Sequence, residues 1–562
     1  MRHEAFWLGL ALAALAVVAG CGDDGETTTP TSTTDVGGSG GAAGNGGAGG
    51  SGGVVDPTAV CGELGLPSRP FEQATPSSAL YAVASDLSIP TTAGDYQLSA
   101  RWSGCDSYLF IQDEPRQNSG FELGIWERDL DHLFERLPRN VELFFASVAT
   151  DVGARDASVA VLQGEIASAF AGMSADDVGW WTPRVHYVTA RAQALDGWLG
   201  ELMTNPRWGV GIDRFQRIRY IGSYADYARY DSGQGWFAPN IAMAANEPIY
   251  YDFEAERQAR LDAAGATVVE VFTGEVASDP DSAGLTLTAD ATLPTAAEMA
   301  SYDTLELDLA LGCVGDGEFG DCPAWDYDVD LRLCDEADPN VCSTQIGRWI
   351  TTYHRRGRWV HDVSGFLPLL SAGGSRRFAF YSQQPYEVTL SLRLSSAGKA
   401  ERPSETLPLW SATVEFNETY NDAFPPVTLA TPADAAKVEL VTALTGHGMS
   451  QPGNCAEFCN TTHTFTVNGT PYVRDFPDAG TTDGCMAQVG VGTVPNQYGT
   501  WWYGRSGWCP GKEVSLDSID ITADVLLGED NLFEYQGLYQ GQPYTGDDWR
   551  RIALVSAIVV SR

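Results

Sequence analysis

Asp326, which lies beside a predicted strand, is a candidate catalytic residue. From residue 327 to residue 333, apolar and polar side chains alternate, which is typical of a half-buried strand. Asp326 continues this alternation on the face that carries Asp328 and Asp330. We therefore expect its carboxylate to point away from the core, where a ligand can reach it. A solvated acidic strand face gives the same pattern and is common in proteins.

A second candidate lies farther along, where Cys455, Cys459 and His463 are each four residues apart. This spacing suits a metal site, but it also suits a short disulfide. The sequence contains 11 cysteines, and ten of them remain once Cys21 is set aside. In an exported chain those ten favour a disulfide framework, although sequence alone leaves the pairing open. Their order suggests the pairs Cys61–Cys105, Cys313–Cys322, Cys334–Cys342, Cys455–Cys459 and Cys485–Cys509.

The N-terminus predicts that the chain is exported. A short basic start precedes an apolar run from Phe6 to Val18, which has the length of a signal-peptide core rather than a membrane span. The run ends in Val-Val-Ala-Gly before Cys21, which resembles a bacterial lipoprotein signal with an acylated cysteine. Ordinary signal cleavage that leaves Cys21 free is the alternative. We expect residues 1–20 to be the signal and a lipid on Cys21 to hold the chain at an outer membrane or cell surface.

Residues 21–56 are rich in Gly, Ser and Thr and predict a flexible tether with a mean reach of about 30 Å. The rest of the chain is too long for one core, so we expect three domains. The net charge of −40 argues against a nucleic-acid partner. We expect a monomer without cofactor or metal.

Residues 57–262 alternate strand-like and helical patterns, and we expect an α/β domain of unknown role. Strands are predicted at 108–111, 141–148 and 185–189, with helices between and after them. The order is faintly similar to a thioredoxin fold, but Trp102-Ser103-Gly104-Cys105 is not a Cys-x-x-Cys motif. The charged run from Asp213 to Arg219 is interpreted as a structural ion network.

Beyond residue 265 the pattern changes to period two, as in the leucines at 305, 307, 309 and 311. Helical patterns are nearly absent, so we expect two antiparallel β modules, at 263–402 and 403–562. The overall fold class is thus α+β multidomain. Further strands are predicted at 388–394, 438–444, 464–467, 519–525 and 552–560.

Several motifs in this region resemble a known family. The first module contains Cys322-Pro-Ala-Trp-Asp326, the run from Ile346 to Tyr353, and His361-Asp-Val-Ser364. The second contains the run from Gly453 to Cys459, Thr462-His-Thr464, and Arg505-Ser-Gly-Trp-Cys-Pro-Gly511. In this order and spacing they resemble peptide-N-glycosidase F over residues 265–562. The resemblance leaves residues 57–262 outside, so it predicts that this region is not required for the chemistry.

The resemblance implies two eight-stranded jelly rolls packed side by side. It also implies an amidase that hydrolyses the bond between an N-linked glycan and asparagine in a glycoprotein or glycopeptide, leaving aspartate. By motif position Asp326 is the catalytic aspartate, Glu457 helps to hold substrate and water, and Arg505 is an active-site arginine. A carboxylate near Asp326 would raise the pKa of one member of the pair, as water activation requires. Trp325, Trp501, Trp502 and Trp508 are candidates for sugar stacking, with packing inside the protein as the alternative for each.

Three positions differ from the family. A second assisting glutamate is replaced by Gln383, which by its position is expected to bind substrate. The arginine after the catalytic aspartate is replaced by Tyr327, and a tryptophan is missing near residues 445–447. These differences favour one alternative, a non-catalytic surface lipoprotein that binds glycan or peptide. A second alternative, a copper-dependent monooxygenase on paired jelly rolls, is disfavoured because the seven histidines include no His-x-His.

Overall fold

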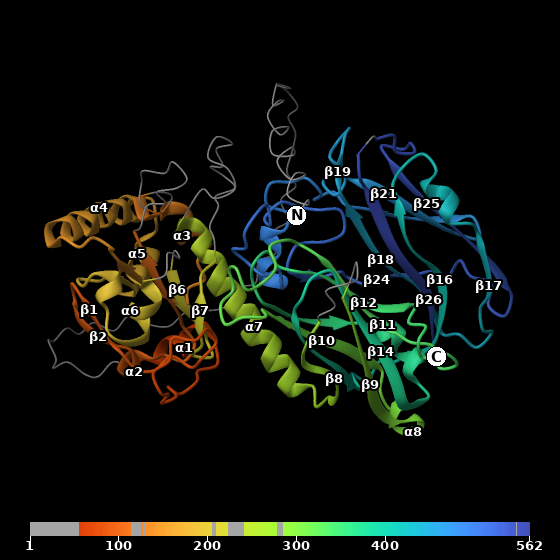
Figure 1. Ribbon diagram of the computed structural model, residues 1–562, viewed down its shortest axis with the longest axis horizontal. Helices are drawn as coiled ribbons and strands as arrows, with labels where there is room; N and C mark the ends of the chain where they lie inside the picture. Colours follow the sequence, from red (N-terminus) through yellow and green to blue (C-terminus); the bar gives the residue numbers. More distant parts are fainter. Residues whose placement is uncertain are drawn as a thin grey trace, which may run out of the picture. The chain divides into compact units, whose positions relative to one another are not determined.

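The structure is a computed structural model that describes residues 56–113, 125–127, 130–204, 209–222, 241–277, 285–546 and 548–562. The predicted signal at 1–20, the lipid site at Cys21 and all but the last residue of the 21–56 tether lie outside these residues. The chain divides into Met1–Val55 and one compact unit, Asp56–Arg562. Along Asp56–Arg562, helices come first and strands predominate later (Figure 1).

The N-terminal region is built on a five-stranded sheet in the order β5-β4-β3-β6-β7. Its parallel strands are β3 (Ser107–Gln112), β4 (Val141–Ala146) and β5 (Val185–Tyr187), and β6 (Gly209–Ile212) and β7 (Ile218–Tyr220) are antiparallel. The predicted α/β pattern with some parallel strands is confirmed, while the thioredoxin likeness stays a prediction. A hairpin of β1 (Ser88–Thr91) and β2 (Gly94–Gln97) forms a separate small sheet.

Seven helices accompany these strands among the described residues up to Ala263. The longest two are α4 (Val152–Ala171) and α7 (Asn246–Ala263). Helix α4 begins where Asp151 accepts a hydrogen bond from the backbone N–H of Ala154, which satisfies a free donor of the first turn. The others are α1 (Ala59–Leu64), α2 (Leu98–Arg101), α3 (Leu130–Arg136), α5 (Ala175–Trp181) and α6 (Gly197–Met203).

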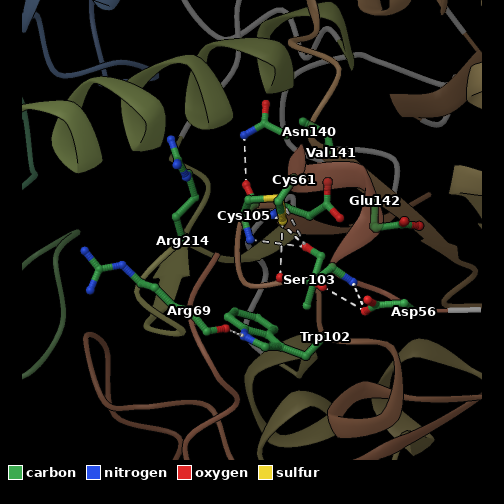
Figure 2. The surroundings of a disulfide bond; sticks show 12 residues. Asp56, Cys61, Arg69, Trp102, Ser103, Cys105, Asn140, Val141, Glu142 and Arg214 are labelled. Atoms are coloured by element: carbon green, nitrogen blue, oxygen red, sulfur yellow. Dashed lines mark hydrogen bonds between the residues drawn. A yellow bond between two sulfur atoms is a disulfide. The ribbon is translucent and has the colours of Figure 1, made fainter. Parts of the chain in front are cut away.

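A disulfide between Cys61 and Cys105 joins α1 to the turn that precedes β3 (Figure 2). The backbone oxygen of Cys105 accepts a hydrogen bond of 3.0 Å from the Asn140 amide, just before β4. The Trp102 indole N–H donates to the backbone oxygen of Arg69 at 2.9 Å. The N-terminal segment is therefore tied to the start of the central strand β3 by one covalent bond and by hydrogen bonds.

The first β region consists of two antiparallel sheets with a shared core. One has the order β13-β10-β15-β8 and the other the order β23-β12-β11-β14-β9. The leucines predicted to face inward, from Leu305 to Leu311 on β10, are all buried. The strands are β8 (Thr267–Val276), β9 (Leu285–Thr295), β10 (Thr304–Gly312), β11 (Asp328–Leu333), β12 (Thr344–Ile350), β13 (Gly357–Asp362), β14 (Gly373–Ser382) and β15 (Glu387–Ser395), with a short α8 (Ala296–Met299).

The second β region also has two antiparallel sheets, in the orders β16-β26-β18-β24 and β17-β25-β21-β22. A short strand from this region, β23 (Lys512–Glu513), pairs with β12 and so extends a sheet of the first region. The other strands are β16 (Pro403–Glu415), β17 (Val427–Ala430), β18 (Lys437–His447), β19 (Met449–Ser450), β20 (Cys455–Ala456), β21 (Thr461–Val467), β22 (Thr470–Asp475), β24 (Asp517–Asp520), β25 (Asp530–Tyr539) and β26 (Arg551–Ser561).

The structure thus has mostly antiparallel sheets with helices at the start, in agreement with an α+β fold class. The assignment of the β regions to jelly rolls stays a prediction, as does the division at 57–262, 263–402 and 403–562. One predicted strand is wrong in its position, because β24 ends at Asp520 instead of extending to Val525. There the Asp520 carboxylate accepts hydrogen bonds from the backbone and hydroxyl of Thr522, which turns the chain.

All five predicted disulfide pairs are confirmed. Cys455 and Cys459, the alternative metal ligands, are bonded to each other. Within the described ranges, no helix combines the length and apolar character needed to cross a membrane.

Candidate active site

A cleft of about 470 Å³ brings together residues from both β regions. Asp326 lies in the loop before β11, Tyr353 follows β12, and Glu457 comes directly after β20. Asp326 and Glu457 are 131 positions apart in the sequence, and both reach one buried guanidinium, that of Arg505. The residues that line the cleft are Trp325, Asp326, Tyr353, Met449, Asn454, Glu457, Phe458, Gly480, Thr500 and Tyr503.

Arg505 contacts both carboxylates from the interior of the protein. Its Nη2 lies 3.6 Å from Asp326 Oδ2, its Nε donates to Glu457 Oε1 at 3.1 Å, and its side chain has no exposed surface. The other N–H groups donate to the backbone oxygens of Thr500 and Tyr503, to the Thr500 hydroxyl and to the Tyr353 hydroxyl. Because its donors are occupied within the protein, Arg505 is suited to hold the carboxylates rather than to contact a substrate directly.

Each carboxylate has a further partner. The Tyr353 hydroxyl donates to Asp326 Oδ2 at 2.6 Å, and the Gly448 N–H donates to Glu457 Oε2 at 3.2 Å. The Gly448 carbonyl accepts from the Glu457 N–H at 3.0 Å, so the two residues bind each other through both backbone groups and the side chain. The disulfide between Cys455 and Cys459 closes the short loop in which Glu457 lies.

Burial is the main influence on the ionisation of both carboxyl groups. It raises the pKa of Asp326, while the Arg505 charge and the Tyr353 hydrogen bond lower the pKa. Burial also raises the pKa of Glu457, to about 7, with Arg505 acting against this rise and the Asp326 charge adding to it. Each side chain keeps 16% of its surface exposed, so both can meet a ligand in the cleft.

We expected strand alternation to point the Asp326 carboxylate away from the core, and this explanation is wrong. The residue precedes β11 rather than extending it, because the Tyr327 N–H donates to the Thr351 hydroxyl at 2.8 Å. The acidic face of β11 is also not simply solvated. Asp328 pairs with Arg551 at 3.0 Å, and Asp330 pairs with Arg332 at 2.6 Å. Asp326 reaches the cleft through its loop and its Tyr353 contact.

The predicted aromatic residues lie in different places. Trp325 is 48% exposed and lines the cleft beside Tyr353. Trp508 is buried, stacks on His447 and contacts the Arg505 guanidinium. Trp501 and Trp502 are buried in the core, where a sugar cannot reach their faces. Gln383 follows β14 and is not among the residues that line the cleft.

Tyr353 and Asn454 are among the cleft residues that were not assigned a role from the sequence. Tyr353 ends the quoted run from Ile346, but only the structure shows that its hydroxyl reaches Asp326. Asn454 lines the cleft, and its Oδ1 accepts from Gln451 while its amide N–H groups have no partner among the described residues. The sequence offered one signal for this residue, its place between Gly453 and Cys455, and the structure gives it a positive φ of 54°.

The charged run from Asp213 to Arg219 does form an ion network, as predicted. Arg214 pairs with Asp252 at 2.9 Å, and Arg219 pairs with Asp213 at 2.8 Å and with Glu254 at 2.7 Å. Arg219 borders a second cleft, of about 340 Å³. Glu254 on α7 and Asp213 after β6 balance the positive charge of Arg219 at this edge of the second cleft.

The two histidines of the second β region are buried. His447 Nε2 lies 2.9 Å from the Thr445 hydroxyl, and His463 lies between Thr461 and Tyr535, at 2.9 and 2.6 Å. These contacts place both rings in side-chain hydrogen-bond networks of the core.

Comparison with known proteins agrees with these motifs. A family model described as "Peptide-N-glycosidase F, C terminal" matches residues 415–560. Peptide-N(4)-(N-acetyl-beta-D-glucosaminyl)asparagine amidase F of Elizabethkingia miricola is 23% identical over 327 residues, which cover 54% of this chain and 86% of that protein. The chain resembles peptide-N-glycosidase F. Glu457 and Arg505 lie inside the segment matched by the family model, and Asp326 precedes it.

Three similar solved structures have TM-scores between 0.41 and 0.43. A crystal structure of peptide-N(4)-(N-acetyl-beta-D-glucosaminyl) asparagine amidase is 19% identical, with a TM-score of 0.43, and covers 53% of this chain and 96% of that one. The structure of PNGase F, a glycosylasparaginase from Flavobacterium meningosepticum, has the same identity and coverage and a TM-score of 0.42. PNGF-II is 13% identical with a TM-score of 0.41, covering 55% of this chain and 68% of that one.

Proposed function

We propose that this protein is an amidase that hydrolyses the bond between an N-linked glycan and asparagine in glycoproteins or glycopeptides. The observation that carries the proposal is the meeting of Asp326 and Glu457 on the buried Arg505, inside a cleft wide enough for a ligand. The resemblance to peptide-N-glycosidase F supplies the substrate class. A pair of carboxylates with perturbed pKa values in a cleft is the arrangement expected for acid–base work.

In the proposed reaction Asp326 removes a proton from water, and the oxygen of that water attacks the side-chain carbonyl of the glycosylated asparagine. The tetrahedral intermediate then collapses, the carbon–nitrogen bond breaks, and aspartate and a glycosylamine are released. Burial raises the pKa of Asp326 and makes it a better base than a free aspartate. The hydrogen bond from Tyr353 fixes the direction of its carboxylate.

Glu457 is assigned to the leaving nitrogen, which must gain a proton before it departs. With a pKa of about 7, this carboxyl group is close to half protonated at neutral pH. Arg505 holds the two acids at fixed positions and balances their charge. For the negative charge on the carbonyl oxygen, the unused amide N–H groups of Asn454 are the candidate donors in the cleft.

The rim of the cleft provides apolar surface for a saccharide. Trp325 is 48% exposed and Met449 is 62% exposed, although large apolar side chains normally avoid solvent. An exposed indole offers a flat face on which a sugar ring can stack. The same surface also favours the second candidate function, a module that binds glycan or peptide without cleaving it.

We further propose that the chain is exported and held at a bacterial surface by a lipid on Cys21, on the basis of the sequence before and at that residue. The segment from residue 21 to 56 would then separate the folded unit from the membrane, and the protein would act as a monomer. Mass analysis of the membrane fraction, with the Cys21→Ser variant as control, tests the anchor.

Incubation of the soluble chain with a denatured N-glycoprotein, followed by peptide mass analysis, tests the activity. Conversion of the glycosylated asparagine to aspartate, with release of the intact glycan, is the expected result. Retention of glycan on the protein without any conversion would support the binding module and reject the amidase.

A further inference from the structure

Glu247, at the start of α7, is a buried acid that the proposed chemistry does not use. Its side chain has no exposed surface, and burial raises its pKa while the neighbouring Arg355 charge lowers its pKa. We infer that the N-terminal α/β region positions the active site through Glu247. The inference rests on the proposed function for its kinetic consequences, but its structural basis stands on the contacts of Arg355 and Tyr353.

Arg355 is the centre of this arrangement. Its Nη1 donates to Glu247 Oε1 at 2.8 Å and to the Pro495 carbonyl at 2.5 Å, and its Nη2 donates to the Tyr220 carbonyl at 2.9 Å. Its Nε donates to Glu318 Oε2 at 3.3 Å. The side chain is 5% exposed, so one buried guanidinium joins β7 and α7 to a loop of each β region.

Glu247 also binds the second of these loops directly. The Asn496 amide donates to Glu247 Oε1 at 3.1 Å, across 249 positions of sequence. The next residue, Gln497, accepts a hydrogen bond of 2.9 Å from the backbone N–H of Tyr353. The Gln497 amide donates to the carbonyls of Val494 and Pro510, so this side chain cannot move without breaking three hydrogen bonds.

This series of contacts ends at Asp326, the proposed base. Tyr353 is two residues before Arg355, and the Thr352 hydroxyl donates to the Arg355 carbonyl, which closes the turn between them. The position of the Tyr353 ring is thus set by Arg355 on one side and by Gln497 on the other. Its hydroxyl then donates to Asp326 and lowers the pKa of that group. Glu247 is therefore a positioning residue that acts on Asp326 through Tyr353.

The ion pair between Arg260 and Glu306 provides a matched control. It also joins α7 to the first β region, but Arg260 lies thirteen residues farther along the helix, about 20 Å away at the usual rise. Glu306 is 7% exposed, and Glu306→Gln is the same chemical change as Glu247→Gln. The Glu306→Gln variant therefore measures the effect of losing a link between α7 and the first β region without disturbing the Tyr353 loop.

The test compares Glu247→Gln, Glu306→Gln, Tyr353→Phe and the Glu247→Gln, Tyr353→Phe double variant in the full chain. We expect Glu247→Gln to lower kcat about 10- to 100-fold, as misplacement of a catalytic group does. It should move the acidic limb of the pH–rate profile to higher pH, because Asp326 without its Tyr353 partner ionises less readily. Tyr353→Phe should give the same movement of the limb, and the double variant should move it no further.

An unchanged acidic limb in folded Glu247→Gln, additive movements in the double variant, or an equal effect of Glu306→Gln would overturn the inference. If Glu247→Gln does not fold, Asn496→Gly replaces it, since glycine keeps the left-handed backbone at this position (φ 50°). This change removes the side-chain amide, whose two contacts are with Asn246 and Glu247, both on α7. If the parent releases no glycan, the proposed function fails. Carbon-13 NMR titration of Asp326 in the same variants then tests the positioning alone, with the same expected order of pKa values.

Discussion

Replacing Glu457 by glutamine should change how the stability of the protein depends on pH. In the folded chain burial raises the pKa of Glu457 from 4.5 to about 7, so the folded state binds the proton more tightly than the unfolded state. The stabilisation from this proton is fully present below pH 4.5 and is lost as the pH rises through about 7. Glutamine has no proton to lose and removes this dependence.

The size of the effect follows from the two pKa values. Each pH unit between them contributes about 1.4 kcal/mol, which gives a change of up to about 3 kcal/mol in the free energy of unfolding between pH 4.5 and pH 8. The side chain is only 16% exposed, so solvent screening reduces this value modestly. Relative to the parent, Glu457→Gln should thus gain up to about 3 kcal/mol on going from pH 4.5 to pH 8.

Urea unfolding of both proteins at pH 4.5, 6 and 8, followed by tryptophan fluorescence, measures the difference. Glu415→Gln provides a control, the same substitution at a side chain that is 61% exposed. Parallel stability curves for the parent and Glu457→Gln across this range would refute the argument, because Glu457 would then titrate alike in both states.

Asp326→Asn keeps the shape of the proposed base and removes its charge, so glycan release should fall by about 10²- to 10⁴-fold with little change in the unfolding curve; release at the parental rate would reject Asp326 as the base. Arg505→Met leaves two neighbouring carboxylates without their cation, and it should raise the pKa of Glu457 by about one to two pH units, as NMR titration would show. Gln383→Glu adds a carboxylate outside the cleft lining and should change kcat/KM less than twofold, whereas a large change would place residue 383 in the site. A chain that begins at Asp262 lacks Glu247 and the Tyr220 carbonyl, so Arg355 loses two buried partners and we expect non-cooperative unfolding. A stable, active truncated chain would instead agree with the expectation drawn from the motifs alone.

The β regions were predictable where one physical pattern dominates. The leucines of β10 alternate with polar residues because one face of the strand is buried, and the structure has them all in the core. The exact end of β24 was not predictable, since it depends on a side-chain bond between Asp520 and Thr522 rather than on hydrophobicity. The five disulfides followed chain order, because most pairs close short loops.

The sequence predicted the charged residues of the site but not the residues that contact them. Asp326, Glu457 and Arg505 were found by motif, and the structure brings them together. The burial of Trp502 could not be found in the same way, because a tryptophan looks alike in a sequence whether it packs or binds. Tyr353 escaped notice since its contact with Asp326 spans two strands and depends on the path of the loop after β12.

The bond between Asn496 and Glu247 has a consequence for the order in which the chain folds. Glu247 leaves the ribosome 249 residues before its partner, a delay of about 10 to 50 seconds at usual rates of synthesis. During that interval the N-terminal sheet can form, and Arg355 is made 108 residues after Glu247, but the bond from Asn496 cannot form until the interval ends. The bonds that fix Tyr353 are therefore among the last to form, and the protein acquires its cleft only after nearly the whole chain has been made.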